Sequence, residues 1–124
     1  MNRFYFEVHF TDPGLARVGW SLGGANLELG CDNRSWGYGG TAKKSTAKDF
    51  ADYGQTFGEK FDVIGNIVDL DNNIIWFTKA GKDLGIAFKI APQMAEQNVF
   101  FPAICVKNAG VSLKFTGISH TSHV

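Results

Sequence analysis

The sequence has little of the features that announce several protein classes. Two cysteines and three prolines among 124 residues exclude a disulfide framework and a proline-rich fibrous chain. No apolar run approaches the roughly 18 residues of a membrane-spanning helix, and the alternating start gives no sign of a signal peptide. Twelve Lys and Arg balance twelve Asp and Glu, which excludes the strongly basic balance of a dedicated nucleic-acid-binding protein.

What is present favours one β-rich domain. The chain is 44% hydrophobic and 14% aromatic, which is enough to form a core and argues against intrinsic disorder. Its length leaves no room for two ordinary domains. Eleven phenylalanines and fifteen glycines favour short strands joined by frequent turns.

Hydrophobic periodicity predicts where the strands lie. Phe4, Phe6, Val8 and Phe10 alternate with other residues, as in a strand with one buried face. Similar reasoning predicts strands over residues 4–10, 15–21, 35–40, 63–70, 74–77, 84–90, 101–106 and 111–115. Four consecutive apolar residues over 74–77 predict a central strand buried on both faces, 41–53 reads as a long loop, and 93–97 as a brief helical turn. With no long amphipathic helix, the fold class is all-β, a two-layer antiparallel β-sandwich.

No constellation of side chains predicts catalysis, a cofactor or a metal. The glycine-rich stretch around Lys43 and Lys44 fails the phosphate-loop pattern, because the two required glycine positions hold Tyr38 and Lys43. Asp69 and Asp71 share a strand face but have no third ligand at suitable spacing. We therefore expect no catalytic residue, no metal ligand and no cofactor.

The two cysteines, Cys31 and Cys105, lie far apart in the sequence. A disulfide between them is possible on count alone. Two cysteines make no framework, so the preferred interpretation is a pair of reduced, mostly buried thiols in an intracellular protein.

Positive charge is concentrated in one segment. Arg34, Lys43, Lys44 and Lys48 lie between Asp32 and Asp49 with no acidic residue among them. Ordinary solvated surface is the alternative for any exposed lysine. Because loops on a rigid scaffold often carry binding sites, we expect Lys43, Lys44 and Lys48 to form an exposed positive patch, with Arg34 as a candidate addition, that contacts RNA or an acidic protein surface.

Motifs along nearly the whole chain, in a consistent order, resemble a SPRY domain. They include Phe4-Tyr5-Phe6-Glu7-Val8, Arg17-Val18-Gly19-Trp20-Ser21, Leu29-Gly30-x-Asp32-x-x-Ser35-Trp36-Gly37-Tyr38, Asp62-x-Ile64-Gly65, Lys79-Ala80-Gly81 and Phe101-Pro102-Ala103. The stretches 39–54 and 81–88 are similar to the SPRY insert of the DEAD-box helicase 1 group of RNA helicases. The chain departs from the pattern at Ala42, where that group has Gly, and at Ala80, where the family often has Asn.

The resemblance implies a SPRY/B30.2-like sandwich with concanavalin-like jelly-roll topology, a domain over residues 3–117 and a polar tail over 118–124. It implies a non-catalytic protein-interaction module excised from an ATP-dependent DEAD-box RNA helicase, without the helicase domains, that docks protein partners or the helicase core. Its binding rim would include two loops, through Gly23, Gly24, Asn26, Lys107 and Asn108.

The remaining expectations concern the alternatives. An auxiliary RNA-contacting surface through the basic segment is the second hypothesis, and an enzyme or sugar-binding sandwich, argued only by the aromatic content, is the third. We expect a monomer without membrane association, located inside the cell in the nucleus and cytoplasm.

Overall fold

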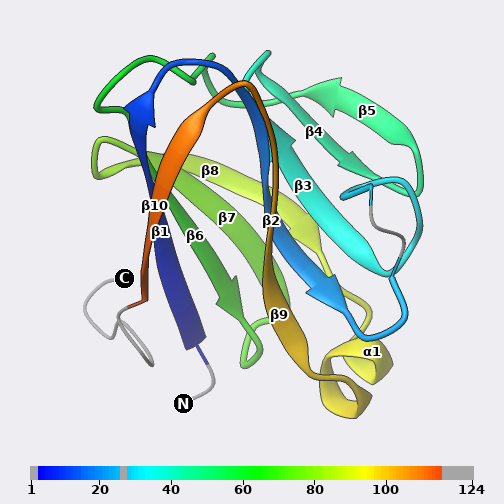
Figure 1. The fold of residues 1–124 in the computed structure, drawn as a ribbon. Helices are drawn as coiled ribbons and strands as arrows, with labels where there is room; N and C mark the ends of the chain where they lie inside the picture. Colours follow the sequence, from blue (N-terminus) through cyan, green and yellow to red (C-terminus); the bar gives the residue numbers. More distant parts are fainter. Residues whose placement is uncertain (1–2, 26–27, 116–124) are drawn as a thin grey trace.

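Two five-stranded antiparallel sheets face each other in the computed structural model, which describes residues 3–25 and 28–115 (Figure 1). The first sheet has the order β10 (Gly110–Phe115), β1 (Arg3–Asp12), β6 (Val63–Asp69), β7 (Ile74–Lys79) and β8 (Lys82–Lys89). The second has the order β5 (Asp49–Asp52), β4 (Lys43–Thr46), β3 (Ser35–Gly39), β2 (Leu15–Leu22) and β9 (Phe100–Lys107). One short helix, α1 (Pro92–Gln97), connects β8 to β9. The predicted two-layer antiparallel sandwich is confirmed.

The core lies between the sheets and follows the predicted alternation. Phe6, Val8 and Phe10 of β1 point inward and are fully buried, while the residues between them are half-buried. Trp20, Trp36, Phe77 and Phe88 are also buried in this core. Tyr38, Tyr53, Phe57 and Phe77 form a cluster of aromatic rings in edge-to-face and tilted contacts, a geometry that stabilises aromatic pairs beyond their buried area.

The prediction of a long loop over 41–53 is wrong, because this segment forms the hairpin of β4 and β5. Its two-residue turn, Ala47 and Lys48, has positive φ at both positions, as in the type I′ turns that match strand twist. Such turns usually carry Asn or Gly. Neither residue is present in this turn, and all four residues of β5 are exposed. The sequence therefore contains no indication of the hairpin.

Two further expectations about burial are corrected. In β7, Ile75 and Phe77 are buried but Ile74 and Trp76 are only half-buried, because the outer face of this sheet has no covering layer in the described part of the chain. The strand is nonetheless central, between β6 and β8. Cys31 and Cys105 form no disulfide, as the preferred interpretation of the sequence held, but both are half-buried instead of mostly buried.

Restoring the family's residue at either departure is expected to stabilise the domain. Ala42 and Ala80 both have positive φ, at 64° and 52°, where the Cβ of a non-glycine residue meets the backbone. Ala80→Asn, which creates an Asn-Gly turn, and Ala42→Gly should each raise the free energy of unfolding by about 0.5–1 kcal/mol. Urea denaturation measures this. Gly81→Ala, at a φ of 79°, should have the opposite effect, and a loss of stability on Ala80→Asn would contradict the argument.

Candidate partner-binding surface

Lys44 helps to hold the two sheets together. Its ammonium group donates a hydrogen bond to the Ala87 carbonyl of β8 at 2.7 Å, and it lies over the rings of Tyr53 and Phe88. The Tyr53 hydroxyl donates to the Gly85 carbonyl of the same strand at 2.6 Å. Lys44 is thus half-buried and bonded across the sheets, so it does not belong to an exposed positive patch.

Lys43 and Lys48 are the exposed lysines of the β4–β5 hairpin. Lys43 pairs with Asp52 directly across the hairpin. Its hydrogen bond and positive charge lower the pKa of the Asp52 carboxyl. No acidic residue lies within the basic segment of the sequence, but the hairpin brings Asp52 to Lys43 from just beyond it.

Arg34 lies in the loop between β2 and β3, away from the start of β4. Its guanidinium donates to the Gly23 carbonyl at 2.9 Å and to Asn98 Oδ1 just after α1 at 3.3 Å. These bonds fix the β2–β3 loop against the helical connection. The expectation of one exposed patch formed by Arg34, Lys43, Lys44 and Lys48 is therefore wrong.

The two loops expected to form one rim leave opposite ends of the second sheet. Lys107 pairs with Leu15 at the start of β2, whereas Gly23 and Gly24 follow Leu22 at its end. An eight-residue strand spans about 23 Å, so Gly23 and Gly24 do not share a rim with Lys107 and Asn108. Asn26 lies outside the described residues.

A pocket of about 310 Å³ opens on the second sheet beside Lys107. It brings together four segments that are distant in sequence: the start of β2, the β2–β3 loop, the end of β3 and the end of β9. Its lining includes Leu15, Arg17, Glu28, Gly40, Val106 and Lys107. The pocket combines exposed aliphatic side chains with charges of both signs.

Arg17 fixes the shape of this pocket. Its guanidinium donates to the Leu29 carbonyl at 2.8 Å and lies 5.2 Å from the centre of the Phe50 ring on β5. The β2–β3 loop is therefore anchored on the face of the sheet. Gly40 is also constrained, because a Cβ there would lie 2.6 Å from the Phe57 carbonyl oxygen. Its N–H donates to the Ala16 carbonyl, which fixes the pocket's edge.

Other classes of site find no support within residues 3–25 and 28–115. No group of three or more His, Cys, Asp or Glu side chains there could hold a metal ion. No helix in that part of the chain is long and apolar enough to cross a membrane.

Residues 3–118 match the family model of the SPRY domain. The chain belongs to the SPRY domain family. It is 49% identical over 114 residues to the ATP-dependent RNA helicase Ddx1 of Drosophila melanogaster and 47% identical over the same length to the ATP-dependent RNA helicase DDX1 of Xenopus laevis. Each match covers 92% of this chain but 15% of the relative. It is also 37% identical over 107 residues to heterogeneous nuclear ribonucleoprotein U-like protein 2 of mouse, covering 85% of this chain and 14% of that protein.

These matches confirm the resemblance to SPRY domains and to the helicase 1 group. SPRY domains are generally protein-interaction modules and are not themselves catalytic. The chain spans about one seventh of the length of the helicases it matches.

Sequence reasoning found Lys107 but missed the rest of the pocket. Its parts, from Leu15 to Lys107, meet only through the pairing of β2 with β9 and β3. No local sequence motif predicts that these strands pair with one another. The one available signal was Arg17, a charged residue within a strand whose neighbours Ala16 and Val18 are apolar.

Proposed function

We propose that this chain is the protein-interaction module of an ATP-dependent DEAD-box RNA helicase and binds an extended peptide segment of a protein partner, or of the helicase core, in the pocket beside Lys107. The observation that carries the proposal is the pocket itself, which four chain segments build and Arg17 holds open. The domain acts as a single chain inside the cell, in the nucleus or cytoplasm.

The chemistry of the lining favours a peptide over a small metabolite. Leu15 and Val106 expose aliphatic surface, and Lys107 and Glu28 offer opposite charges. An extended peptide presents side chains and backbone groups together, so it can use apolar, charged and hydrogen-bonding positions at once. Loops on a rigid sandwich commonly carry such sites.

Removing the pocket's apolar and positive groups tests the proposal. In quantitative affinity capture from cells that express the tagged chain, Leu15→Asp with Lys107→Glu should reduce recovery of specific partners at least tenfold. The matched control is Ile86→Asp with Lys82→Glu, which changes an equally exposed aliphatic residue and an exposed lysine on β8. Equal recovery by both double variants would contradict the proposal.

RNA contact through the β4–β5 hairpin is the second candidate, supported by the exposure of Lys43 and Lys48 on one short hairpin. Lys44 is excluded from the test because it bonds across the sheets. Titration with single-stranded RNA over a range of salt concentrations distinguishes the two functions. Lys43→Glu with Lys48→Glu would lower the salt dependence if each lysine contacts a phosphate, since each such contact contributes about 0.7 to the slope for single strands.

A further inference from the structure

The sandwich is open along one side. β10 and β9 are outermost in their sheets, and both lie on the same side of the molecule, diverging from the turn that joins them (Figure 1). Within the described residues, neither strand has a partner on its outer edge. Their free backbone N–H and C=O groups form a template for another strand.

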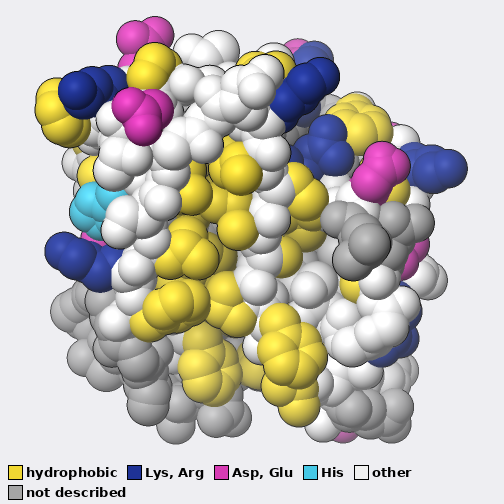
Figure 2. All heavy atoms as spheres, viewed as in Figure 1, with side chains coloured by type: hydrophobic (Ala, Val, Ile, Leu, Met, Phe, Trp, Pro, Cys, Tyr) yellow, Lys and Arg dark blue, Asp and Glu magenta, His cyan; other side chains and the backbone are white. Residues whose placement is uncertain are grey.

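Apolar side chains that belong to the core side of β10 are exposed along this opening. Leu113 pairs with Val8 and Phe115 with Phe6, so they lie on the same face as two fully buried residues. Leu113 is nevertheless 38% exposed and Phe115 59% exposed. Figure 2 shows hydrophobic side chains running down the face of the molecule between the two edge strands.

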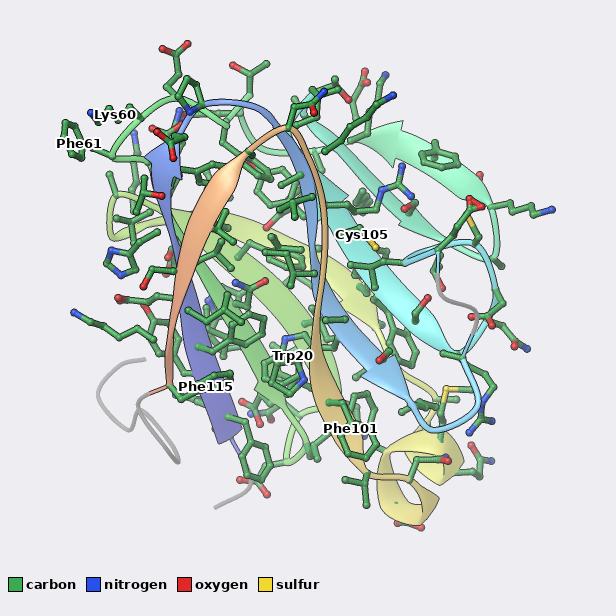
Figure 3. The ribbon with its side chains drawn as sticks, in the orientation of Figure 1. Trp20, Lys60, Phe61, Phe101, Cys105 and Phe115 are labelled. Carbon is green, nitrogen blue, oxygen red and sulfur yellow. The ribbon has the colours of Figure 1, made fainter. Side chains whose placement is uncertain are left out.

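On β9, which forms the other wall of the opening, a residue that pairs with a buried one is likewise exposed. Pro102 pairs with Trp20, whose side chain is 2% exposed, yet Pro102 itself is exposed. Figure 3 places Trp20 in the opening between β10 and β9. The Trp20 Nε1–H group is buried and has no hydrogen-bond acceptor in the described part of the chain. A buried donor of this kind usually has an acceptor.

The opposite side of the sandwich is closed. There Lys44 of β4 and Tyr53, which follows β5, donate hydrogen bonds to carbonyls of β8 in the first sheet. The Tyr53 hydroxyl also accepts from the Phe77 N–H. β9 and β10, by contrast, are each outermost in their own sheet and are not paired with each other in the described part of the chain. The opening is therefore a local property of one edge of this fold.

We propose that an extended segment of the same polypeptide, from outside these 124 residues, adds to the free edge of β10 as a further strand. Its alternate apolar side chains cover Leu113 and Phe115, and it supplies an acceptor for Trp20 Nε1–H. Strand addition uses main-chain hydrogen bonds for affinity and alternate side chains for specificity. The opening is lined by apolar groups, so it lacks the charge that an RNA strand would require.

The source of the strand follows from length and position. The helicase relatives extend far beyond the region that matches, since the chain covers 15% of each. The start of β1 and the end of β10 lie at the same end of the sandwich (Figure 1). A segment tethered there has an effective concentration of about millimolar, which favours it over a second copy. This inference rests on the part of the proposed function that places the domain within a longer helicase polypeptide.

Hydrogen exchange of the β10 amides, compared between the 124-residue chain and the full polypeptide encoded by the same gene, tests the proposal. The amides on the free edge should exchange at least 100-fold more slowly in the full polypeptide. There Leu113→Lys should abolish this protection. The matched control, Ser112→Lys, changes the neighbouring exposed residue that pairs with His9 on the other face and should keep the protection. In the 124-residue chain, both variants should melt within about 2 °C of each other.

The other outcomes overturn the proposal in distinguishable ways. Equal exchange in the two chains would show that no segment of the polypeptide covers β10, and the proposed function would stand if the pocket still captured partners. Protection that rises with concentration of the 124-residue chain would identify a second copy as the occupant. Protection only on addition of single-stranded RNA would identify RNA. A gene that encodes no helicase around this domain would overturn both this inference and the placement within a helicase.

Discussion

Replacing Phe77 with alanine is expected to lower the free energy of unfolding by about 3–5 kcal/mol. Phe77 is 0% exposed in the middle of β7 and contacts the rings of Tyr38 and Tyr53 at centroid distances of 5.2 Å and 5.9 Å. The loss combines the transfer free energy of the ring with the cost of the cavity it leaves.

Hydrogen bonds keep the neighbouring rings from filling that cavity. The Tyr38 hydroxyl donates to the Gln55 carbonyl and accepts from the Gln55 N–H, while the Tyr53 hydroxyl donates to the Gly85 carbonyl. Moving either ring toward the cavity would leave these buried polar groups without partners, which itself costs about 1–3 kcal/mol. We therefore expect a value in the upper part of the range.

Urea denaturation of the 124-residue chain measures the change. Phe61→Ala is the control, because Phe61 is 78% exposed and its loss should change the free energy by no more than about 0.5 kcal/mol. The denaturant dependence should be unchanged in both variants if only the native core is affected. A loss below about 1 kcal/mol for Phe77→Ala would show that the ring cluster relaxes, contrary to the argument.

The parts of the fold that sequence predicted are those with a strong local signal. Phe6, Val8 and Phe10 alternate cleanly, and one sheet face is buried, so the register of β1 is fixed by its own residues. The pair β6 and β7 has apolar runs on both sides of Asp71, Asn72 and Asn73, which are ordinary turn residues. Both features can be read within about ten residues.

The missed features depend on tertiary context. The β4–β5 hairpin turns through Ala47 and Lys48, which lack turn chemistry, and its strands are held by β3 and by Lys44. The burial of Lys44 could not be predicted from a run of lysines, because its acceptor lies 43 residues away at Ala87. The candidate pocket depends on the pairing of Leu15 with Lys107 in the same way.

Replacing Asp69 with alanine is expected to cost about 3–5 kcal/mol, because it removes the buried carboxylate that pairs with the Arg3 guanidinium and accepts the hydrogen bonds of the following turn. Asp69 is 1% exposed at the end of β6. Its carboxylate accepts a bond from the Arg3 guanidinium at 2.9 Å and further bonds from the backbone N–H groups of Asp71 and Asn72. The Asn72 side chain donates one more at 2.9 Å.

These bonds also make the contribution of Asp69 to the free energy of unfolding depend on pH. Burial alone would raise the pKa of the Asp69 carboxyl, but hydrogen bonds from Asn72 and Arg3 outweigh it and hold the pKa below its ordinary value of 3.8. Between the lowered pKa and the ordinary one, the unfolded chain binds more protons than the folded chain, so stability rises with pH. The contribution of Asp69 to the free energy of unfolding is therefore complete above about pH 5 and is lost as the pH falls through the folded-state pKa.

Urea denaturation between pH 2 and pH 7 should show this directly. The gap in free energy between the wild-type chain and Asp69→Ala should be constant above about pH 5 and should narrow as the pH falls below about 4. Asp71→Ala, in the same turn, keeps the backbone N–H that donates to Asp69 and replaces an exposed side chain, so it should cost less stability than Asp69→Ala above about pH 5. A gap that persists undiminished at pH 2 would mean that packing of the Asp69 side chain, and not its charge, stabilises the end of β6 and its turn.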